Sequence, residues 1–276
     1  PSCSDEARAT PVPDPPQGCQ SSETENAAGG CCPAGTTPLE DGSCQPAGVP
    51  ADGCSEGFVH DGDAGCEPIL PAEPCPQGLM AVPGETVCRE VAPCGSGTWG
   101  DIPIEPSTEH VDASYTGGSS DGSASKPWTT IGEAVAAAGE GAIVAVATGS
   151  YQESVVIQGK AVRLWGRCPT LVEVVRTGAE LGAIFIKQGA TGTEVHSLAI
   201  RGGSVGLVLS GSQAVVLDRA WVHGNAVRGV NVEDAFGPTS VVVRGSLIET
   251  NREIGVHASG SEATIESTVV RDTLPR

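Results

Sequence analysis

The side chains with the most evident chemistry lie in the second half of the chain, where an aromatic residue and several ionisable groups recur at regular steps. Arg201 precedes His223 by 22 residues, and Trp221 and His223 precede Leu247 and Glu249 by 26. An indole ring stacks on the face of a sugar, while imidazole, carboxylate and guanidinium groups bond its hydroxyls. If one structural element repeats at these steps, the four residues Trp221, His223, Glu249 and Arg201 form one ligand-binding surface for a glycan.

Catalysis is the second kind of chemistry to consider. Glu233 and Asp234 are adjacent acids, but cleaving a glycosidic bond needs two carboxylates at a defined separation in a pocket. Phe236-Gly-Pro238 follows them, which is typical of a solvated turn. No nucleophile motif, phosphate-binding loop or cofactor fingerprint occurs. We therefore predict no catalytic residue and no cofactor.

Metal binding has little support either. The stretch Asp61-Gly-Asp63-Ala-Gly65 is similar to a calcium loop, but it lacks the later glutamate of such loops, so a turn is expected. No two cysteines are separated by two intervening residues, the C-x2-C spacing that is typical of zinc sites. We predict no metal site.

The cysteines follow a repeat of their own in the first 98 residues, which hold ten of the 11 in the chain. Four consecutive pairs are separated by 12, 12, 12 and 13 residues, and three begin with a C-x2-G pattern such as Cys32-Pro-Ala-Gly35. A loop of this size closed by one bridge restrains the unfolded chain by about 3 kcal/mol, which suits a segment without an apolar core. Local pairing is the simplest prediction, although crossed connectivities remain open. The predicted local pairs are Cys19 to Cys31, Cys32 to Cys44, Cys54 to Cys66 and Cys75 to Cys88.

Three cysteines remain after local pairing. Cys94 and Cys168 can join the cysteine-rich segment to the rest of the chain, which leaves Cys3 for a lipid anchor, a partner or a free thiol. A chain with this many cysteines belongs in an oxidising compartment, so we expect the cell surface, the periplasm or the medium. No stretch approaches the roughly 18 apolar residues of a membrane span, so membrane attachment would need that lipid anchor. The chain starts at Pro1 without a signal segment, and we interpret it as processed or cut.

Charge excludes one class of partner. The chain has a net charge of −19, with 15 acidic against 2 basic residues up to residue 98 and 19 against 13 beyond it. Binding to nucleic acid needs clusters of lysine and arginine that neutralise phosphates. We therefore predict no nucleic-acid partner, and composition divides the chain into a disulfide-stapled stalk of residues 1–98 and a second domain of residues 99–276.

The second domain carries short Val-rich runs separated by glycine-containing turns, at 142–147, 154–158, 161–165, 172–175 and 183–186. Further along, the runs beginning at Val195, Leu217, Val243 and Ile265 superpose at steps of 22, 26 and 22 residues. Steps of this length suit one coil of a parallel β-helix, and the leucine and asparagine consensus of a leucine-rich repeat is missing. The last run stops inside a repeat, so we expect the natural chain to continue or another element to cover that end.

Stacking these coils in register predicts which side chains point outward. Outward side chains at equivalent positions of successive coils form columns. Besides the glycan surface, these columns fit a second interpretation, because coils about 4.8 Å apart place opposite charges over one another as a ladder. Exposed pairs of that kind contribute about 0 to 1 kcal/mol each. The outward columns are Ala199, Trp221, Leu247 and Val269; Arg201, His223, Glu249 and Arg271; and His196, Asp218, Arg244 and Glu266.

Residues 110–170 contain further recognisable stretches: His110-Val-Asp-Ala-Ser, the Gly- and Ser-rich run from Gly117 to the Trp-Thr-Thr-Ile ending at Ile131, a helix expected over 132–138 behind the capping box Thr130-x2-Glu133, and the apolar run before Tyr151. They resemble an opening domain of unknown function found in many secreted bacterial parallel β-helix proteins of the pectate-lyase-like superfamily. The resemblance implies fold and export. The superfamily's hydrolase motifs NTD, DD and GHG are absent.

These observations predict an all-β protein: a right-handed parallel β-helix with a short N-terminal capping helix, preceded by a disulfide-rich segment of little regular structure. Our first hypothesis is an extracytoplasmic surface or secreted protein with a binding or display role toward polysaccharide or surface glycan. The alternatives are a polysaccharide lyase or glycoside hydrolase, and a purely structural spacer.

Overall fold

The computed structural model describes residues 18–276 except 21, 47, 51 and 63–64, so Cys3 lies outside the described residues. The chain divides into two compact units, Pro1–Ile69 and Leu70–Arg276. Composition places the boundary at residue 98, whereas in the structure the 29 residues from 70 to 98 belong to the compact unit of the second domain. Among the described residues, no helix is long and apolar enough to cross a membrane.

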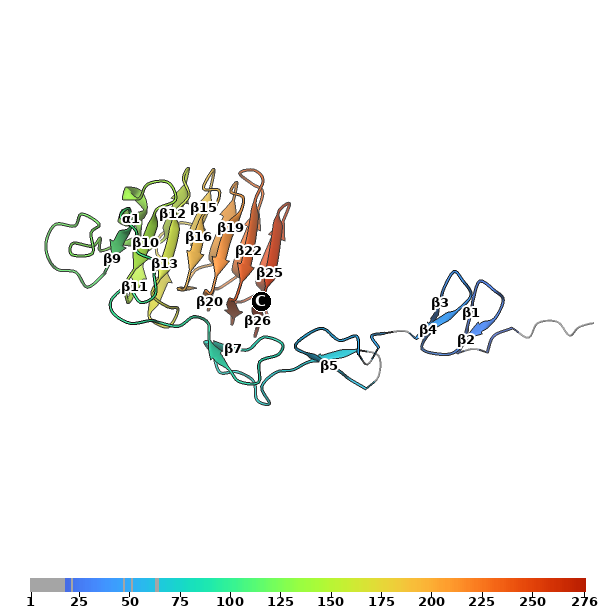
Figure 1. The fold of residues 1–276 in the computed structure, drawn as a ribbon. Coiled ribbons are helices and arrows are strands. Elements are labelled where there is room, and N and C mark those ends of the chain that lie inside the picture. The colour runs from blue at the N-terminus through green and yellow to red at the C-terminus, as the bar shows by residue number, and fades with distance from the viewer. Residues whose placement is uncertain (1–17, 21, 47, 51, 63–64) are drawn as a thin grey trace, which may run out of the picture. The chain divides into compact units, whose positions relative to one another are not determined.

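The cysteine-rich segment consists of small antiparallel hairpins, each tied by one disulfide (Figure 1). We call the segments closed by the four local bridges the first to fourth modules: residues 19–31, 32–44, 54–66 and 75–88. The fourth module lies in the second unit. The hairpin strands are β1 (Thr24–Glu25) with β2 (Cys31–Cys32), β3 (Thr36–Pro38) with β4 (Cys44–Pro46), β5 (Phe58–His60) with β6 (Cys66–Pro68), and β7 (Leu79–Met80) with β8 (Arg89–Glu90).

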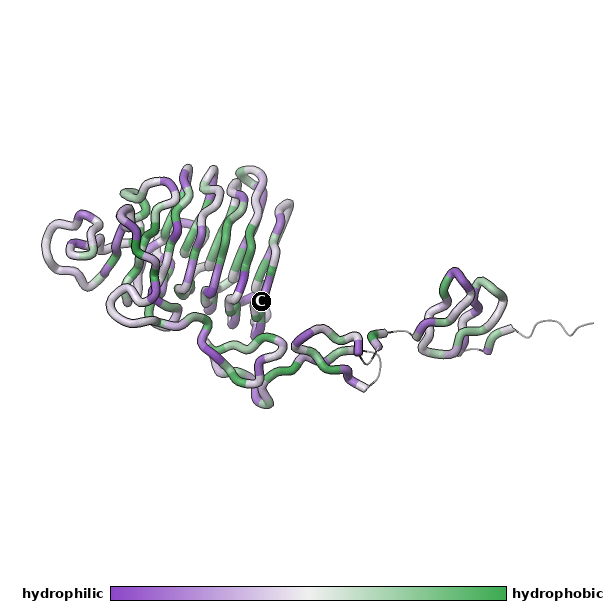
Figure 2. The backbone as a smooth tube through the Cα atoms, in the orientation of Figure 1, coloured by the Kyte–Doolittle hydropathy of each residue, from purple (hydrophilic) through white to green (hydrophobic). Residues whose placement is uncertain are grey.

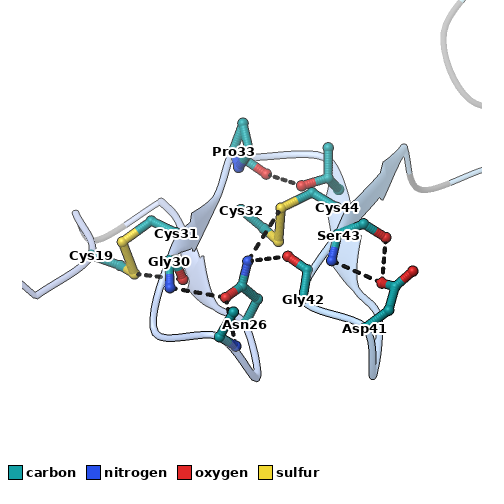
Figure 3. Close-up of a disulfide and its surroundings, with 12 residues drawn as sticks. Cys19, Asn26, Gly30, Cys31, Cys32, Pro33, Asp41, Gly42, Ser43 and Cys44 are labelled. Carbon is teal, nitrogen blue, oxygen red and sulfur yellow. Dashed lines mark hydrogen bonds between the residues drawn. A yellow bond between two sulfur atoms is a disulfide. The ribbon is translucent and has the colours of Figure 1, made fainter.

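Polar side chains shape the turns of these modules where no core is available. In Figure 3, the Asn26 side chain donates to the carbonyl of Gly42 at 2.6 Å and accepts from the backbone N–H of Gly30 at 2.9 Å. Asp41 accepts from both the N–H and the hydroxyl of Ser43. Short polar side chains that bond nearby backbone groups stabilise turns, so the first two modules hold their shape by hydrogen bonds and disulfides.

The predicted disulfide pairing is confirmed. The four local bridges form at separations of 12, 12, 12 and 13 residues. Cys94 pairs with Cys168, 74 residues away, and joins the segment after the fourth module to the second coil of the β-helix. The five bridges indicate an oxidising, extracytoplasmic environment.

Residues 109–276 form an all-β parallel solenoid of about six turns, as predicted (Figure 1). Each complete coil contributes one strand to each of three parallel sheets, which hold seven, six and five strands. The first sheet holds β9 (Glu109–Val111), β10 (Ile143–Val146), β13 (Arg163–Gly166), β16 (Glu194–His196), β19 (Val215–Asp218), β22 (Ser240–Arg244) and β25 (Glu262–Glu266). The second holds β11 (Gly149–Gln152), β14 (Val172–Val175), β17 (Ala199–Arg201), β20 (Trp221–His223), β23 (Leu247–Glu249) and β26 (Val269–Arg271). The third holds β12 (Val155–Gln158), β15 (Gly182–Lys187), β18 (Val205–Ser210), β21 (Arg228–Glu233) and β24 (Ile254–Ser259).

The corner between the first and second sheets has a fixed backbone conformation. Ser197, Arg219, Gly245 and Ser267 have φ between 44° and 56°, at the same 22, 26 and 22 residue steps as the strands. This left-handed conformation turns the chain sharply. The ladder continues through the corner, because the N–H of Arg219 donates to the carbonyl of Arg244 in the next coil at 3.0 Å. The corner therefore bends the four coils that contain these residues at the same place without breaking the stack.

Apolar side chains fill the interior of the coils, and hydrophobic residues follow the strands of the stack (Figure 2). Five of the six residues predicted to lie inside are completely buried, and Val256, in the last third-sheet strand, is partly buried against the same core. Coils gain this burial only from their neighbours above and below. The predicted inside residues are Leu198, Ile200, Val222, Val230, Ile248 and Val256.

Two buried asparagines follow the second sheet. The amide of Asn225 donates to the side-chain oxygen of Asn251 at 2.8 Å, and Asn251 donates to the carbonyl of Val222 at 2.9 Å. The N–H of Gly203 donates to Asn225 in turn. Buried polar groups need such partners, and this ladder ties three successive turns together.

A short helix closes the first coil. Helix α1 (Ile131–Ala137) starts one residue before the predicted range and has the predicted capping box between Thr130 and Glu133. Glu153 accepts from the N–H groups of Ile131 and Gly132 at 2.8 Å each, which satisfies two free donors of the first turn. The helix buries Ile131, Ala134 and Val135 against β9, β10 and β12.

Replacing Ile200 with Asp should unfold the coils, because the side chain is completely buried between neighbouring strands. The variant loses about 1.5 to 3 kcal/mol of apolar burial and must also bury a carboxylate. Thermal unfolding measures the loss. Val242→Asp, at a half-buried outward position of β22, is the matched control and should retain most of the stability. An unchanged melting temperature for Ile200→Asp would show that the register is wrong.

Candidate functional site

The outward columns predicted from the repeat are present. Ala199 pairs with Trp221, Trp221 with Leu247, and Leu247 with Val269 across the second sheet. His223 pairs with Glu249, and Glu249 with Arg271. We call this outward face of β20, β23 and β26 the outer ledge: Trp221, His223, Leu247, Glu249, Val269 and Arg271.

Several outward residues of this ledge are nevertheless buried. Leu247 is completely buried and Glu249 is 1% exposed, because the fourth module lies directly on them. Met80 of that module, with no exposed surface, packs with Val91 and Leu247, and Trp221 and Val269 pack at the edge of this cluster. Glycan binding by an open ledge assumed that these side chains face solvent. In the structure the chain's own disulfide loop covers them.

Glu249 is the centre of this contact. Its carboxylate accepts from the backbone N–H of Gly78 at 2.8 Å and from the indole N–H of Trp221 at 2.9 Å. Arg271 donates to the same carboxylate at 2.7 and 2.9 Å. A buried charge is tolerated only when it is paired and hydrogen-bonded, and four donors meet that requirement here.

Arg271 carries the contact further into the fourth module. Its guanidinium donates to the carbonyl oxygens of Cys75, Pro76 and Leu79 at 2.8, 3.0 and 2.9 Å. Gly78 has φ +82°, and a Cβ there would meet the Trp221 ring at 3.3 Å. The ledge therefore recognises backbone groups of a tight turn that only glycine forms without strain.

Trp221 has its polar atom and part of its ring surface engaged. Its N–H is bonded to Glu249, and its ring stacks on His223 with centroids 3.8 Å apart and planes at 18°. Gly78 lies against the ring as well. Stacking of a sugar on this ring is expected only if the fourth module moves away.

His223 is 8% exposed, and its Nε2 has no hydrogen-bond partner among the residues that the structure describes. Burial lowers the pKa of this imidazole; the charges of Glu173 and Glu249 oppose the effect, and Arg201 adds to it. Arg201, the remaining predicted site residue, forms an ion pair with Glu173 of the preceding coil. The structure thus places all four predicted residues on one face, with Arg201 directed to another partner.

The segment that follows the fourth module continues along the β-helix toward its first coil. Arg167 donates to the carbonyl of Cys94 beside the Cys94–Cys168 bridge. Ile102 packs against Ile143 and Ala145 of β10. Arg163 then binds Glu105 through two hydrogen bonds of 3.0 and 2.7 Å. We call residues 70–108 the strap, because they join the last coil to the first along the outside of the stack.

The third outward column is a charge ladder, as the alternative interpretation predicts. His196 lies between Glu194 at 2.7 Å and Asp218 at 3.1 Å, and Asp218 also contacts Arg219 and Arg244 at 3.2 Å each. Burial alone would raise the pKa of Asp218, but the bond from His196 and the two guanidinium groups hold it below its ordinary value.

The remaining candidates are the pair Glu233 and Asp234, where Glu233 ends β21 and Asp234 precedes a turn, and the calcium-like stretch, in which residues 63–64 lie outside the described residues. The N–H of Gly237 donates to the carbonyl of Asp234, and Glu233 accepts from Asn231. The N–H of Gly65 donates to the side chain of Asp61. Among the described residues, one group with metal-ligand geometry occurs, Cys19, Glu23 and Cys31, but its two sulfur atoms are joined in a disulfide.

Comparison of the chain with protein-family models, with curated proteins and with solved structures finds no match. The fold and the compartment therefore rest on the coils and the disulfides themselves. Together these define the class: an extracytoplasmic parallel β-helix protein with a disulfide-rich N-terminal segment.

Substituting Glu249 with Gln should loosen the fourth module. The variant removes the charged acceptor of the two short hydrogen bonds from Arg271, which keeps the longer ion pair with Asp272 at 3.5 Å, so we expect a loss of about 1.5 to 3 kcal/mol. Thermal unfolding and a red shift of the tryptophan emission measure it. Glu266→Gln, at an exposed position of β25, is the control. Equal effects of the two substitutions would contradict a special role for Glu249.

Acidification should weaken the ledge through His223. The folded-state pKa lies below the unfolded value of about 6.5, so the stabilisation by the neutral ring is complete above about pH 6.5 and is lost as the pH falls below it. The carboxylates with lowered pKa values, Glu173 and Asp218, lose their contribution in a lower window, below about pH 4. Melting temperatures between about pH 8 and 5 should fall for the parent and stay flatter for His223→Gln. Parallel profiles for the two proteins would contradict this assignment.

Proposed function

We propose that this protein is an extracytoplasmic display protein with a non-catalytic binding role, in which the disulfide modules form a stalk and the β-helix is the rigid platform that it carries. We also propose that it is related to the pectate-lyase-like superfamily, on the strength of the residues before and after the capping helix. Glycans are the ligand class that we propose for the platform.

One observation carries the choice of binding over cleavage. The carboxylates of Glu173, Asp218 and Glu249, on the outward face of the coils, are each held by arginine. A lyase or hydrolase needs acids that face the substrate or a metal ion, whereas these acids stabilise the stack. Ladders of this kind suit a platform that stays rigid outside the cell.

The proposed glycan surface is Trp221 with His223, Glu249 and Arg201, and the fourth module controls access to it. Trp221 offers the apolar face that a sugar ring needs, and the neighbouring polar groups match hydroxyl groups. In the docked arrangement Glu249 already binds the Gly78 N–H. Binding therefore requires the sugar to compete with the module, which makes the expected affinity modest.

A glycan array with three proteins tests this proposal: the parent, Gly78→Asp, and Gly78→Asp combined with Trp221→Ala. An aspartate at position 78 places a side chain against the Trp221 ring and a second carboxylate beside Glu249, so the module should leave the ledge. We expect stronger glycan binding by Gly78→Asp than by the parent, and loss of that gain in the double variant. Absence of binding in all three would favour a purely structural spacer, and release of unsaturated oligosaccharides would favour a lyase.

A further inference from the structure

The second, third and fourth modules share one local backbone. Each opens with a C-x2-G turn closed by a hydrogen bond of 3.0 to 3.1 Å from the residue after the glycine to the residue after the cysteine. Each then forms a short hairpin whose second strand begins at the second cysteine, or one residue after it in the fourth module. The three turn glycines have nearly equal φ values: Gly35 at 80°, Gly57 at 85° and Gly78 at 82°.

The fourth module docks through this shared backbone and two buried apolar side chains, and the partly buried Val82 packs beside them. The N–H of its turn glycine donates to Glu249. Arg271 donates to the carbonyls of the first cysteine, of the residue after it and of the residue after the glycine. Met80, two residues after the glycine, and Val91, three residues after the second cysteine, fill the apolar contact with Leu247. Little of this recognition depends on other side chains of the module.

The third module carries the same backbone groups and has aliphatic residues at the positions of Met80 and Val91, whereas Asp61 stands four residues after its turn glycine, where the fourth module has Val82. Val59 stands at the position of Met80 and is 50% exposed, whereas Met80 is completely buried. Ile69, three residues after Cys66, stands at the position of Val91. No hydrogen bond from the N–H of Gly57 occurs within the described part of the chain.

The second module differs at the positions that matter. Thr37 occupies the position of Met80, so the apolar contact is lost. The hydroxyl of Thr36 donates to the carbonyl of Pro33 at 2.7 Å, the carbonyl that corresponds to the Arg271 acceptor Pro76. This module therefore serves as a natural comparison with the same backbone and weaker docking chemistry.

We propose that the third module is a docking module for the outer ledge of a parallel β-helix on another chain. The ledge it fits carries a glutamate and an arginine in one column of adjacent coils, with an aliphatic side chain beside the glutamate. The chain's own ledge is filled by the fourth module, so the third module can engage such a surface only on a separate molecule.

The geometry explains why a β-helix is the fitting partner. Adjacent coils lie about 4.8 Å apart, which places the carboxylate and guanidinium of one column side by side. That separation matches the turn's N–H and its carbonyls, as the bonds of Gly78 to Glu249 and of Cys75 to Arg271 demonstrate. An exposed valine at the edge of a disulfide-fixed hairpin then adds apolar burial at small entropic cost.

Loop exchange within the full chain tests whether the surfaces are equivalent. In one chimaera residues 52–69 replace residues 73–91, and in a second the corresponding residues of the second module replace them. Exchange of the Trp221 indole N–H with deuterium, followed by NMR, reports docking. We expect the third-module chimaera to exchange on the order of tenfold more slowly than the second-module chimaera, because it buries Val59 in place of Thr37. Introducing Gly57→Asp into the first chimaera should remove the protection.

Association between molecules is tested with an oxidised peptide of residues 52–69. The peptide is added to the Gly78→Asp protein, whose ledge is free, and the tryptophan emission is followed. Saturable binding that the Gly57→Asp peptide lacks is the expected result. Equal exchange rates in the two chimaeras, or no binding by the peptide where an oxidised peptide of residues 73–91 binds, would overturn the proposal. These readouts need no glycan, so they fail or succeed independently of the proposed function.

Discussion

No coil of this protein can bury its own inward side chains, and the whole fold follows from that constraint. Ile200 is covered only because Val174 and Val222 lie above and below it in adjacent strands. In four successive coils the stack repeats one corner geometry, which the left-handed residues Ser197, Arg219, Gly245 and Ser267 provide. It also needs an end cover, and α1 provides that at the first coil.

Stacking has a second consequence on the outside, where it brings chemically different side chains into fixed columns. In one column Asp218 accepts a hydrogen bond from His196 and forms an ion pair with Arg244. In another, Glu249 and Arg271 form a pair whose remaining hydrogen-bonding capacity is directed away from the coils. The strap uses that capacity. Its disulfide to Cys168 and its contact with Arg271 lie on different coils, so separating these coils would also require the strap to detach.

The cysteine-rich modules are stabilised in a different way from the coils. They have too few apolar residues for a core, so disulfides and turn glycines fix their shape. Most of what they present to a partner is therefore backbone. Recognition of backbone by a carboxylate and an arginine tolerates variation in the side chains of the module. On our proposal, the modules differ in docking chemistry at single positions such as Thr37, Val59 and Met80.

Much of this architecture was accessible from the sequence. Equal spacing predicted the four local disulfides, because a segment without an apolar core needs covalent links to keep its structure. The steps of 22 and 26 residues predicted the register of Trp221, Leu247 and Glu249, because the inward apolar residues recur once in every coil. The strand β11 and the domain boundary after Ile69 were not predicted, since neither has a composition signal of its own. Only the tertiary structure decided that the ledge is covered. The contact that covers the ledge joins the backbone N–H of Gly78 to the side chain of Glu249, 171 residues away. Because every residue except proline has a backbone N–H, the sequence does not indicate which partner a given N–H binds.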